Sequence, residues 1–139
     1  IGMEYLIREL LEVDGYHAKV LSKTRFPDFA DADIEAARES HISADQLFVQ
    51  VKHHNGRTDS WGADQLRGIQ CSDEFADHQL VLVTSGDVDD GVRKQCEDYG
   101  VVVLDGNALA QWILDCLPGL SDKTRMALRI SRVPNLLRA

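Results

Sequence analysis

The chain is short, moderately apolar and acidic. Its 139 residues are 44% hydrophobic and 27% charged, which is enough to bury one core, so we expect a single domain. It contains no apolar run near the roughly 20 residues that cross a bilayer, and no signal-peptide pattern precedes the first expected helix. We therefore expect an intracellular, cytoplasmic protein without a membrane partner. The formal charge of −8 argues against a protein that binds nucleic acid through overall charge alone.

The charge is unevenly distributed along the chain. Residues 121–139 carry five basic side chains against one acidic side chain, a net +4, which leaves −12 on residues 1–120. Such a tail is most often a solvated helix face, and contact with phosphates is the alternative. We expect a core domain in residues 1–120 and a basic helix and tail in 121–139 that packs on it or extends from it. Because Ile1 is followed almost at once by helix, we also expect a fragment of a longer, multidomain polypeptide.

The N-terminal part predicts one helix followed by three strands. Apolar residues recur at helical spacing over residues 2–13, and Asp14-Gly15 is typical of a helix end. The expected strands occupy residues 16–21, 31–36 and 47–53. The last two alternate in polarity and flank a polar segment, residues 39–45, so they should pair as a hairpin.

The C-terminal part alternates helices and strands. The expected helices occupy residues 61–75, 88–99, 108–117 and 121–131, and the expected strands occupy residues 79–84 and 101–104. Both strands are almost wholly apolar, as in strands covered on both faces. A strand–helix–strand unit of this length implies a right-handed crossover and parallel pairing. The fold class expected is therefore an α/β sandwich with a central mixed sheet of about five strands.

Three cysteines are widely separated in the sequence, without the paired spacing of a metal site. They are Cys71, Cys96 and Cys116. Each lies in a helix-like context that would accept a small apolar residue, so buried free thiols are favoured over nucleophiles or metal ligands.

Three polar side chains lie on the two strands of the expected hairpin: Asp33, Gln50 and Lys52. Because side chains alternate across a strand, Gln50 and Lys52 share one face, whereas Val49 and Val51 point into the core. Polar groups in such a setting need partners or water. The Asp33 carboxylate, the Gln50 amide oxygen and the Val51 carbonyl are ligands that suit a hard ion such as Mg²⁺.

The same group of side chains favours phosphodiester hydrolysis. The Lys52 ammonium would orient an attacking water or stabilise charge that develops on a phosphate. Glu4 would add a second carboxylate if the first helix packs beside the strands.

An ordered series of motifs resembles the Mrr-like branch of the PD-(D/E)xK nucleases over residues 2–117. The motifs are Gly2-x-Glu4, Leu10-x-x-x-Asp14-Gly15-Tyr16, Asp33, Gln50-x-Lys52, Leu82-Val83-Thr84-Ser85-Gly86 and Val102-Val103-Leu104-Asp105-Gly106-Asn107-Ala108-Leu109. Each motif is weak alone, and their order and spacing carry the resemblance.

The resemblance implies a restriction-endonuclease-like α/β/α sandwich and a metal-dependent endonuclease that hydrolyses DNA in prokaryotic restriction or defence, with Mg²⁺ or Mn²⁺. It implies that Asp33 binds the metal and that Lys52 is the catalytic lysine. Gln50 takes a position often held by Asp or Glu, Glu4 assists the metal or its water, and Gln65 is a weaker candidate. A homodimer is expected, because cutting both strands of a duplex calls for two sites.

Two departures from the family pattern leave alternatives open. Asp31-Ala32 stands where the family more often has glycines, so Asp31 competes for the ligand role, and no basic face is evident in the core region. One rival is a catalytically inactive nucleic-acid-binding or scaffolding module. The other is a nuclease that acts on RNA or branched DNA.

Other motifs favour structural interpretations. His53 and His54 would face opposite sides of a strand, so they do not predict a shared zinc ion. Trp61 is interpreted as a core or helix-entry residue rather than a base-stacking platform, and Thr84-Ser85-Gly86 as a strand-end turn rather than a nucleophile elbow.

Overall fold

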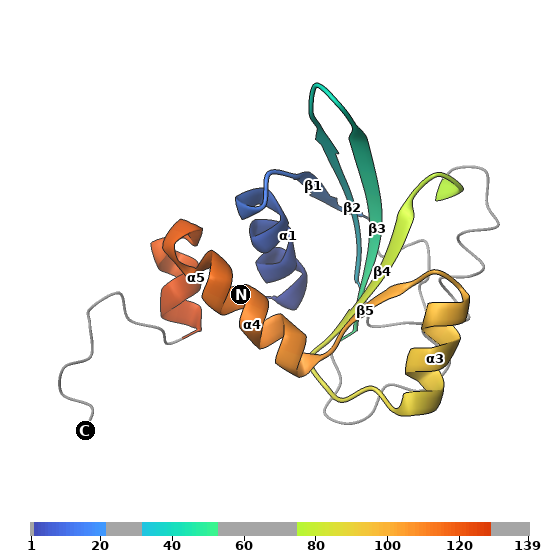
Figure 1. Ribbon diagram of the computed structural model, residues 1–139. Coiled ribbons are helices and arrows are strands. Elements are labelled where there is room, and N and C mark those ends of the chain that lie inside the picture. The colour runs from blue at the N-terminus through green and yellow to red at the C-terminus, as the bar shows by residue number, and fades with distance from the viewer. Residues whose placement is uncertain (1, 22–31, 53–74, 129–139) are drawn as a thin grey trace.

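The protein is built on a five-stranded mixed sheet. The computed structural model describes residues 2–21, 32–52 and 75–128 (Figure 1). The strands lie in sequence order and are β1 (His17–Val20), β2 (Ala32–Glu39), β3 (Ala44–Lys52), β4 (Gln79–Thr84) and β5 (Val102–Leu104). The first three pair antiparallel, whereas β3 with β4 and β4 with β5 pair parallel. The predicted mixed sheet of about five strands is confirmed.

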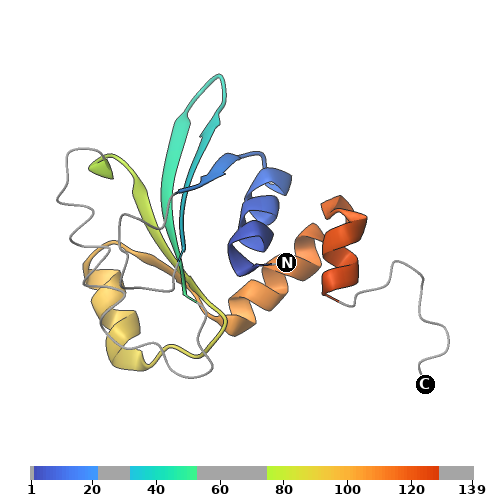
Figure 2. The same ribbon diagram turned by 180° about the vertical axis from the view of Figure 1, so that it is seen from behind.

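Helices cover both faces of this sheet. They are α1 (Met3–Val13), α3 (Asp90–Asp98), α4 (Gly106–Cys116) and α5 (Asp122–Ala127), with a short 3₁₀ helix at Leu117–Gly119. Figures 1 and 2 show α1 and α4 on one face and α3 on the other, which confirms the α/β/α sandwich. Within the three described segments, no helix is both long and apolar enough to span a membrane.

Two apolar clusters hold the three layers together. The cluster under α1 and α4 includes Leu6, Ile7, Leu10, Ile34, Val49, Val51, Val81 and Val83. The cluster under α3 includes Phe48, Phe75, Leu80, Leu82, Val88, Val92 and Cys96. Successive residues of β3 and β4 alternate between the clusters, and this alternation explains the apolar runs of these strands.

The helix and strand ends follow local turn chemistry. Gly15 has φ +95°, a conformation that favours glycine and ends α1 as predicted. The β2–β3 hairpin is longer than expected, because the Ser40 hydroxyl accepts hydrogen bonds from the N–H groups of Ile42 and Ser43 and closes a turn of residues 40–43. The last helix begins where predicted, since Ser121 caps it through Thr124 N–H. Residues 129–131, to which it was expected to extend, lie outside the described part.

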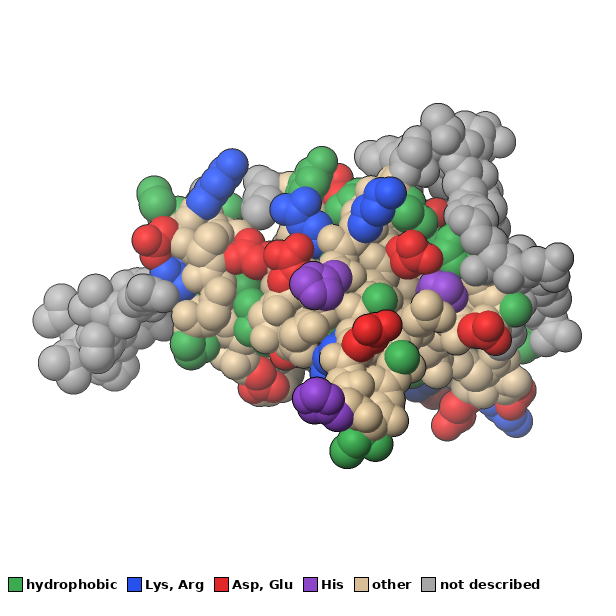
Figure 3. Space-filling model, turned by 90° about the horizontal axis from the view of Figure 1, so that it is seen from above, with side chains coloured by type: hydrophobic (Ala, Val, Ile, Leu, Met, Phe, Trp, Pro, Cys, Tyr) green, Lys and Arg blue, Asp and Glu red, His purple; other side chains and the backbone are tan. Residues whose placement is uncertain are grey.

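The described surface is mixed in charge. On the face seen in Figure 3, acidic and basic side chains are interspersed and no broad basic patch is visible. On that face, a nucleic acid would have to bind through a small number of positions.

Candidate functional site

Asp33 and Gln50 lie directly opposite each other on β2 and β3. The antiparallel register pairs Asp33 with Gln50, and Lys52 follows two residues further along β3. Paired residues of an antiparallel ladder share a face, and so do residues two apart on one strand. The three side chains therefore project from the same side of the sheet, the side on which α3 packs.

All three side chains are deeply buried. Asp33 is 7% exposed, Gln50 is 1% exposed and Lys52 is fully buried. Each takes part in a polar or electrostatic interaction. Within the described part, the Gln50 amide oxygen accepts no hydrogen bond, although the residue has other contacts. A carboxylic acid, an amide and an amine rarely occur together in a protein interior unless they serve one another or a ligand.

Parallel pairing adds a hydroxyl group to this site. Thr84 pairs with Lys52 in the β3–β4 register and is fully buried. Its Oγ1 accepts a hydrogen bond from the N–H of Gly86 at 3.2 Å, so Thr84 is a strand-end turn residue, as predicted. Thr84 and Lys52 thus share the face of the sheet on which Asp33 and Gln50 lie.

A second carboxylate on β2 is turned toward another partner. Glu35 is two residues from Asp33 and on the same face, and its Oε2 lies 3.0 Å from Nε2 of His78, the residue before β4. The spacing Asp33-x-Glu35 predicts that both carboxylates lie on one face of the strand, but the sequence prediction did not use it.

Glu4 reaches the neighbourhood of the site from the other side of the sheet. It lies on α1, which packs on the face opposite to that of Lys52, and lines a groove with Val20 and Leu21. Leu21 N–H donates to the Asp33 carbonyl at 2.8 Å, so this groove borders the strand position that carries Asp33. No described contact joins the Glu4 carboxylate to the other three side chains, and its role stays a prediction.

Several candidates lie outside the described residues. They are Asp31, His53, His54, Trp61, Gln65 and Cys71. Within the described ranges, no group of three or more His, Cys, Asp or Glu side chains is arranged to hold a metal. Among the described residues, the ligands predicted for a metal between β2 and β3 are the Asp33 carboxylate, the Gln50 amide oxygen and the Val51 carbonyl, with Glu4 as a further carboxylate.

The described cysteines are buried thiols, as predicted. Burial raises the pKa of Cys96. Burial, together with the nearby Asp14 carboxylate, raises the pKa of Cys116 to about 11. Thiols with raised pKa values are poor nucleophiles, which favours a structural role for these two.

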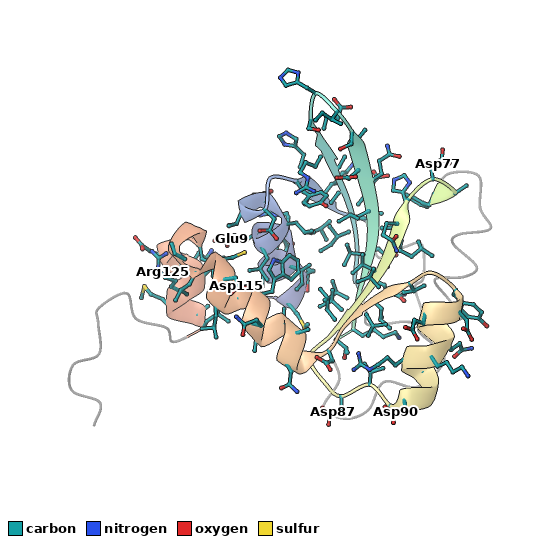
Figure 4. The ribbon with its side chains drawn as sticks, in the orientation of Figure 1. Glu9, Asp77, Asp87, Asp90, Asp115 and Arg125 are labelled. Carbon is teal, nitrogen blue, oxygen red and sulfur yellow. The ribbon has the colours of Figure 1, made fainter. Side chains whose placement is uncertain are left out.

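Glu9, which is partly buried, makes a long-range interaction that the sequence did not predict. Figure 4 shows it on α1 facing α5. Its carboxylate accepts hydrogen bonds from Ser121 N–H and the Thr124 hydroxyl. Burial raises the pKa of Glu9, but these hydrogen bonds outweigh burial and lower the pKa overall. Glu9 thus anchors the start of the basic segment to the core, although 112 residues separate it from Ser121 in the sequence.

The fold and the polar cluster define the class of protein. An antiparallel hairpin that carries an acid opposite Gln-x-Lys, followed by parallel strands in a three-layer sandwich, is the arrangement expected of a restriction-endonuclease-like nuclease. The family model described as restriction endonuclease (Mrr_cat) matches residues 2–113, and the chain belongs to this family.

Two solved structures share the fold. The DNA modification-dependent restriction endonuclease AspBHI aligns with a TM-score of 0.59 and 13% identity, over 93% of this chain and 34% of that chain. The MspJI restriction endonuclease in complex with a 27-mer oligonucleotide aligns with a TM-score of 0.56 and 16% identity, over 91% of this chain and 32% of that chain. The chain thus spans about a third of the length of each. Among curated proteins, none matches the sequence.

Proposed function

We propose that the chain is the catalytic domain of a metal-dependent endonuclease that hydrolyses DNA phosphodiester bonds in restriction. The observation that carries the proposal is the β2–β3 register, which puts Asp33 opposite Gln50 with Lys52 two residues on, all buried on one face. Membership of the restriction endonuclease family supports the reaction, and the oligonucleotide bound to MspJI supports the choice of DNA.

The donor set fits a hard divalent ion such as Mg²⁺. Asp33 contributes a carboxylate, Gln50 an amide oxygen and Val51 a backbone carbonyl, and all three are oxygen ligands of the kind that Mg²⁺ and Mn²⁺ accept. Glu4 is proposed as a further carboxylate that acts on the metal or on its water. When bound, the ion would supply Lewis-acid activation of water and neutralise phosphate charge.

The chain's own residues do the remaining work. Asp33 fixes one negative charge at the end of the hairpin, while the rigid pairing of β2 with β3 holds Gln50 at a constant position opposite it. Lys52 places a cation where it hydrogen-bonds to the attacking water or to the phosphate and stabilises charge that builds up in the transition state. Burial of the three groups strengthens these interactions, because the surroundings screen charge poorly.

Cleavage of supercoiled plasmid tests the proposal. The wild-type protein should cut with Mg²⁺ or Mn²⁺ and stop with EDTA. Asp33→Asn and Lys52→Met keep side-chain size while each removes one charge, and each should lower the rate by at least about 100-fold. Asp87→Asn and Lys94→Met change exposed residues and serve as matched controls that retain activity. Cleavage that survives both Asp33→Asn and Lys52→Met would refute the site.

The same assay separates the rival functions. Binding of plasmid without cleavage under any divalent ion would favour an inactive binding module. Preferential cutting of RNA or of a branched junction would assign another substrate. Because one site cuts one strand, we further propose that two copies act together, and sedimentation in the presence of duplex would show the dimer.

A further inference from the structure

Two adjoining pockets open along α1 and share Tyr5 and Arg8. One pocket continues to Lys19 on β1 and to Leu21, the residue after β1. The other continues to Lys123 at the start of α5. Each has a volume of about 510 Å³. We call the two together the α1 groove, lined by Tyr5, Arg8, Lys19, Leu21 and Lys123.

The α1 groove is lined by three of the four basic residues that, in the described part of the chain, are neither buried nor held in a close ion pair. That part contains eight lysines and arginines. Lys52 and Arg125 are buried. Arg38 and Arg93 are held in ion pairs of 3.1 and 2.9 Å by carboxylates.

Four basic residues are left, and three of them line the α1 groove. Arg8 and Lys123 lie on the α1 side. Lys19 lies on the edge strand β1 opposite Glu35, so its side chain projects from the face that carries Asp33, and Lys94 lies on α3. Three cations gathered in this way within an acidic protein indicate a site for an anion with several charges.

The acids of the groove do not cancel this charge. Glu9 is committed to Ser121 and Thr124, as described above. The Glu4 carboxylate lies against Gly2, where an added Cβ would be 2.9 Å from its Oε1. The nearest carboxylate to Arg8 is that of Glu12, at 3.9 Å, the outer limit of an ion pair between exposed groups. Glu35, which lies opposite Lys19 in the β1–β2 register, is 3.0 Å from Nε2 of His78. Three cations therefore face Glu4, Glu9 and Glu35, and two of these three acids already have other partners.

An exposed aromatic ring stands among the cations. Tyr5 is 46% exposed, and the Arg8 guanidinium carbon lies 5.4 Å from its ring centroid. In sites that bind nucleic acids, cationic side chains contact the phosphate backbone and an aromatic ring among them stacks on a sugar or base. The aromatic ring would contribute nothing to the binding of a small inorganic anion.

The groove ends beside the backbone of Asp33, whose side chain projects from the opposite face of the sheet. Leu21, which lines it, donates its N–H to the carbonyl of Asp33 at 2.8 Å. Because β1 is the edge strand of the sheet, a backbone lying in the groove passes around that edge next to Asp33.

We propose that the α1 groove binds the sugar–phosphate backbone of the DNA, with Arg8, Lys19 and Lys123 contacting phosphates and leading one strand to the edge of the sheet at Asp33. This inference rests on the proposed nuclease function and names the surface that holds the substrate.

Binding of a fluorescein-labelled duplex of random sequence, measured by anisotropy in EDTA, tests the groove without cleavage. Each phosphate contact contributes about 0.9 to the slope of log affinity against log salt, so three contribute about 2.7. Between about 50 and 200 mM salt, these three contacts account for a loss of affinity of roughly 40-fold. The triple variant Arg8→Gln, Lys19→Gln, Lys123→Gln should lose this part of the slope, whereas Lys94→Gln should keep it.

The outcomes distinguish this inference from the proposed function. Loss of slope in the triple variant, with an unchanged melting temperature, supports the groove whether or not the wild type cuts DNA. A triple variant that binds with the wild-type salt slope overturns the proposal that the α1 groove binds DNA. This holds even if Asp33→Asn abolishes cleavage and so supports the proposed nuclease site. A wild-type protein that fails to bind duplex at low salt also overturns it.

Discussion

Replacing Gly106 with alanine should destabilise the protein. A Cβ at this position would lie 2.6 Å from the carbonyl oxygen of Ser85, in the turn after β4. The same turn is fixed to α4 because Gly106 N–H donates to Gly86 O at 3.0 Å, so the contact is relieved only by moving backbone. Overpacking of this kind costs about 1–3 kcal/mol, from which alanine recovers at most about 1 kcal/mol of helix propensity.

Thermal unfolding by circular dichroism measures the effect against a matched control. A net loss of about 1–2 kcal/mol corresponds to a fall in melting temperature of roughly 3–10 °C in a domain of this size. Gly91 also lies in the first turn of a helix capped by an aspartate, but its Cβ would meet Asp89 Oδ1 at an ordinary 3.4 Å. Gly91→Ala should therefore raise the melting temperature slightly. A Gly106→Ala variant that melts at or above the wild-type temperature would contradict the predicted clash with Ser85.

Three further predictions concern Glu9, the cysteines and Lys52. Hydrogen bonding lowers the pKa of Glu9 in the folded state. The ionised Glu9 carboxylate therefore stabilises the fold above its ordinary pKa of 4.5, and this stabilisation is lost as the pH falls through the lowered, folded-state pKa. Urea unfolding should therefore show Glu9→Gln less stable than wild type at neutral pH, with a gap that closes in strong acid. In a Cys71→Ser background, Ellman's reagent at pH 8 should react slowly, since a pKa of about 11 leaves only about one Cys116 thiol in a thousand ionised. Fast labelling without unfolding would contradict this. Lys52→Met should lose activity, and because removing one charged member of a buried polar cluster leaves the others uncompensated, it should also lower the free energy of unfolding by about 3–5 kcal/mol. A circular-dichroism spectrum of the variant separates loss of chemistry from loss of the fold, and full activity in a folded variant would contradict the role of Lys52.

The strands were predictable where their patterns were local. The apolar run of β4 predicted Gln79–Thr84 to the residue, because a strand buried on both faces reads as continuous hydrophobic sequence. The hairpin was predicted too short, because its extension depends on the Ser40 turn rather than on alternation. The full burial of Gln50 and Lys52 was not foreseen, since it depends on the parallel addition of β4 beside β3, which a single sequence does not show.

Interactions between distant segments could not be predicted from the sequence. The α1 groove combines Arg8, Lys19 and Lys123, which lie far apart in the sequence and give no local basic motif. The close approach of Gly106 to Ser85 likewise depends on how α4 meets the end of β4. A single sequence shows which residue types are present, but the pairing of strands and helices decides which of them meet.

The proposal for the catalytic site is tested most directly by locating a bound Mn²⁺ ion through its anomalous scattering in crystals of the protein. We expect one ion coordinated at roughly 2.0–2.2 Å by the Asp33 carboxylate, with the Gln50 amide oxygen among its ligands. The peak should disappear in Asp33→Asn crystals. An ion bound elsewhere, in crystals of a protein that cuts DNA with Mn²⁺, would contradict the proposed site.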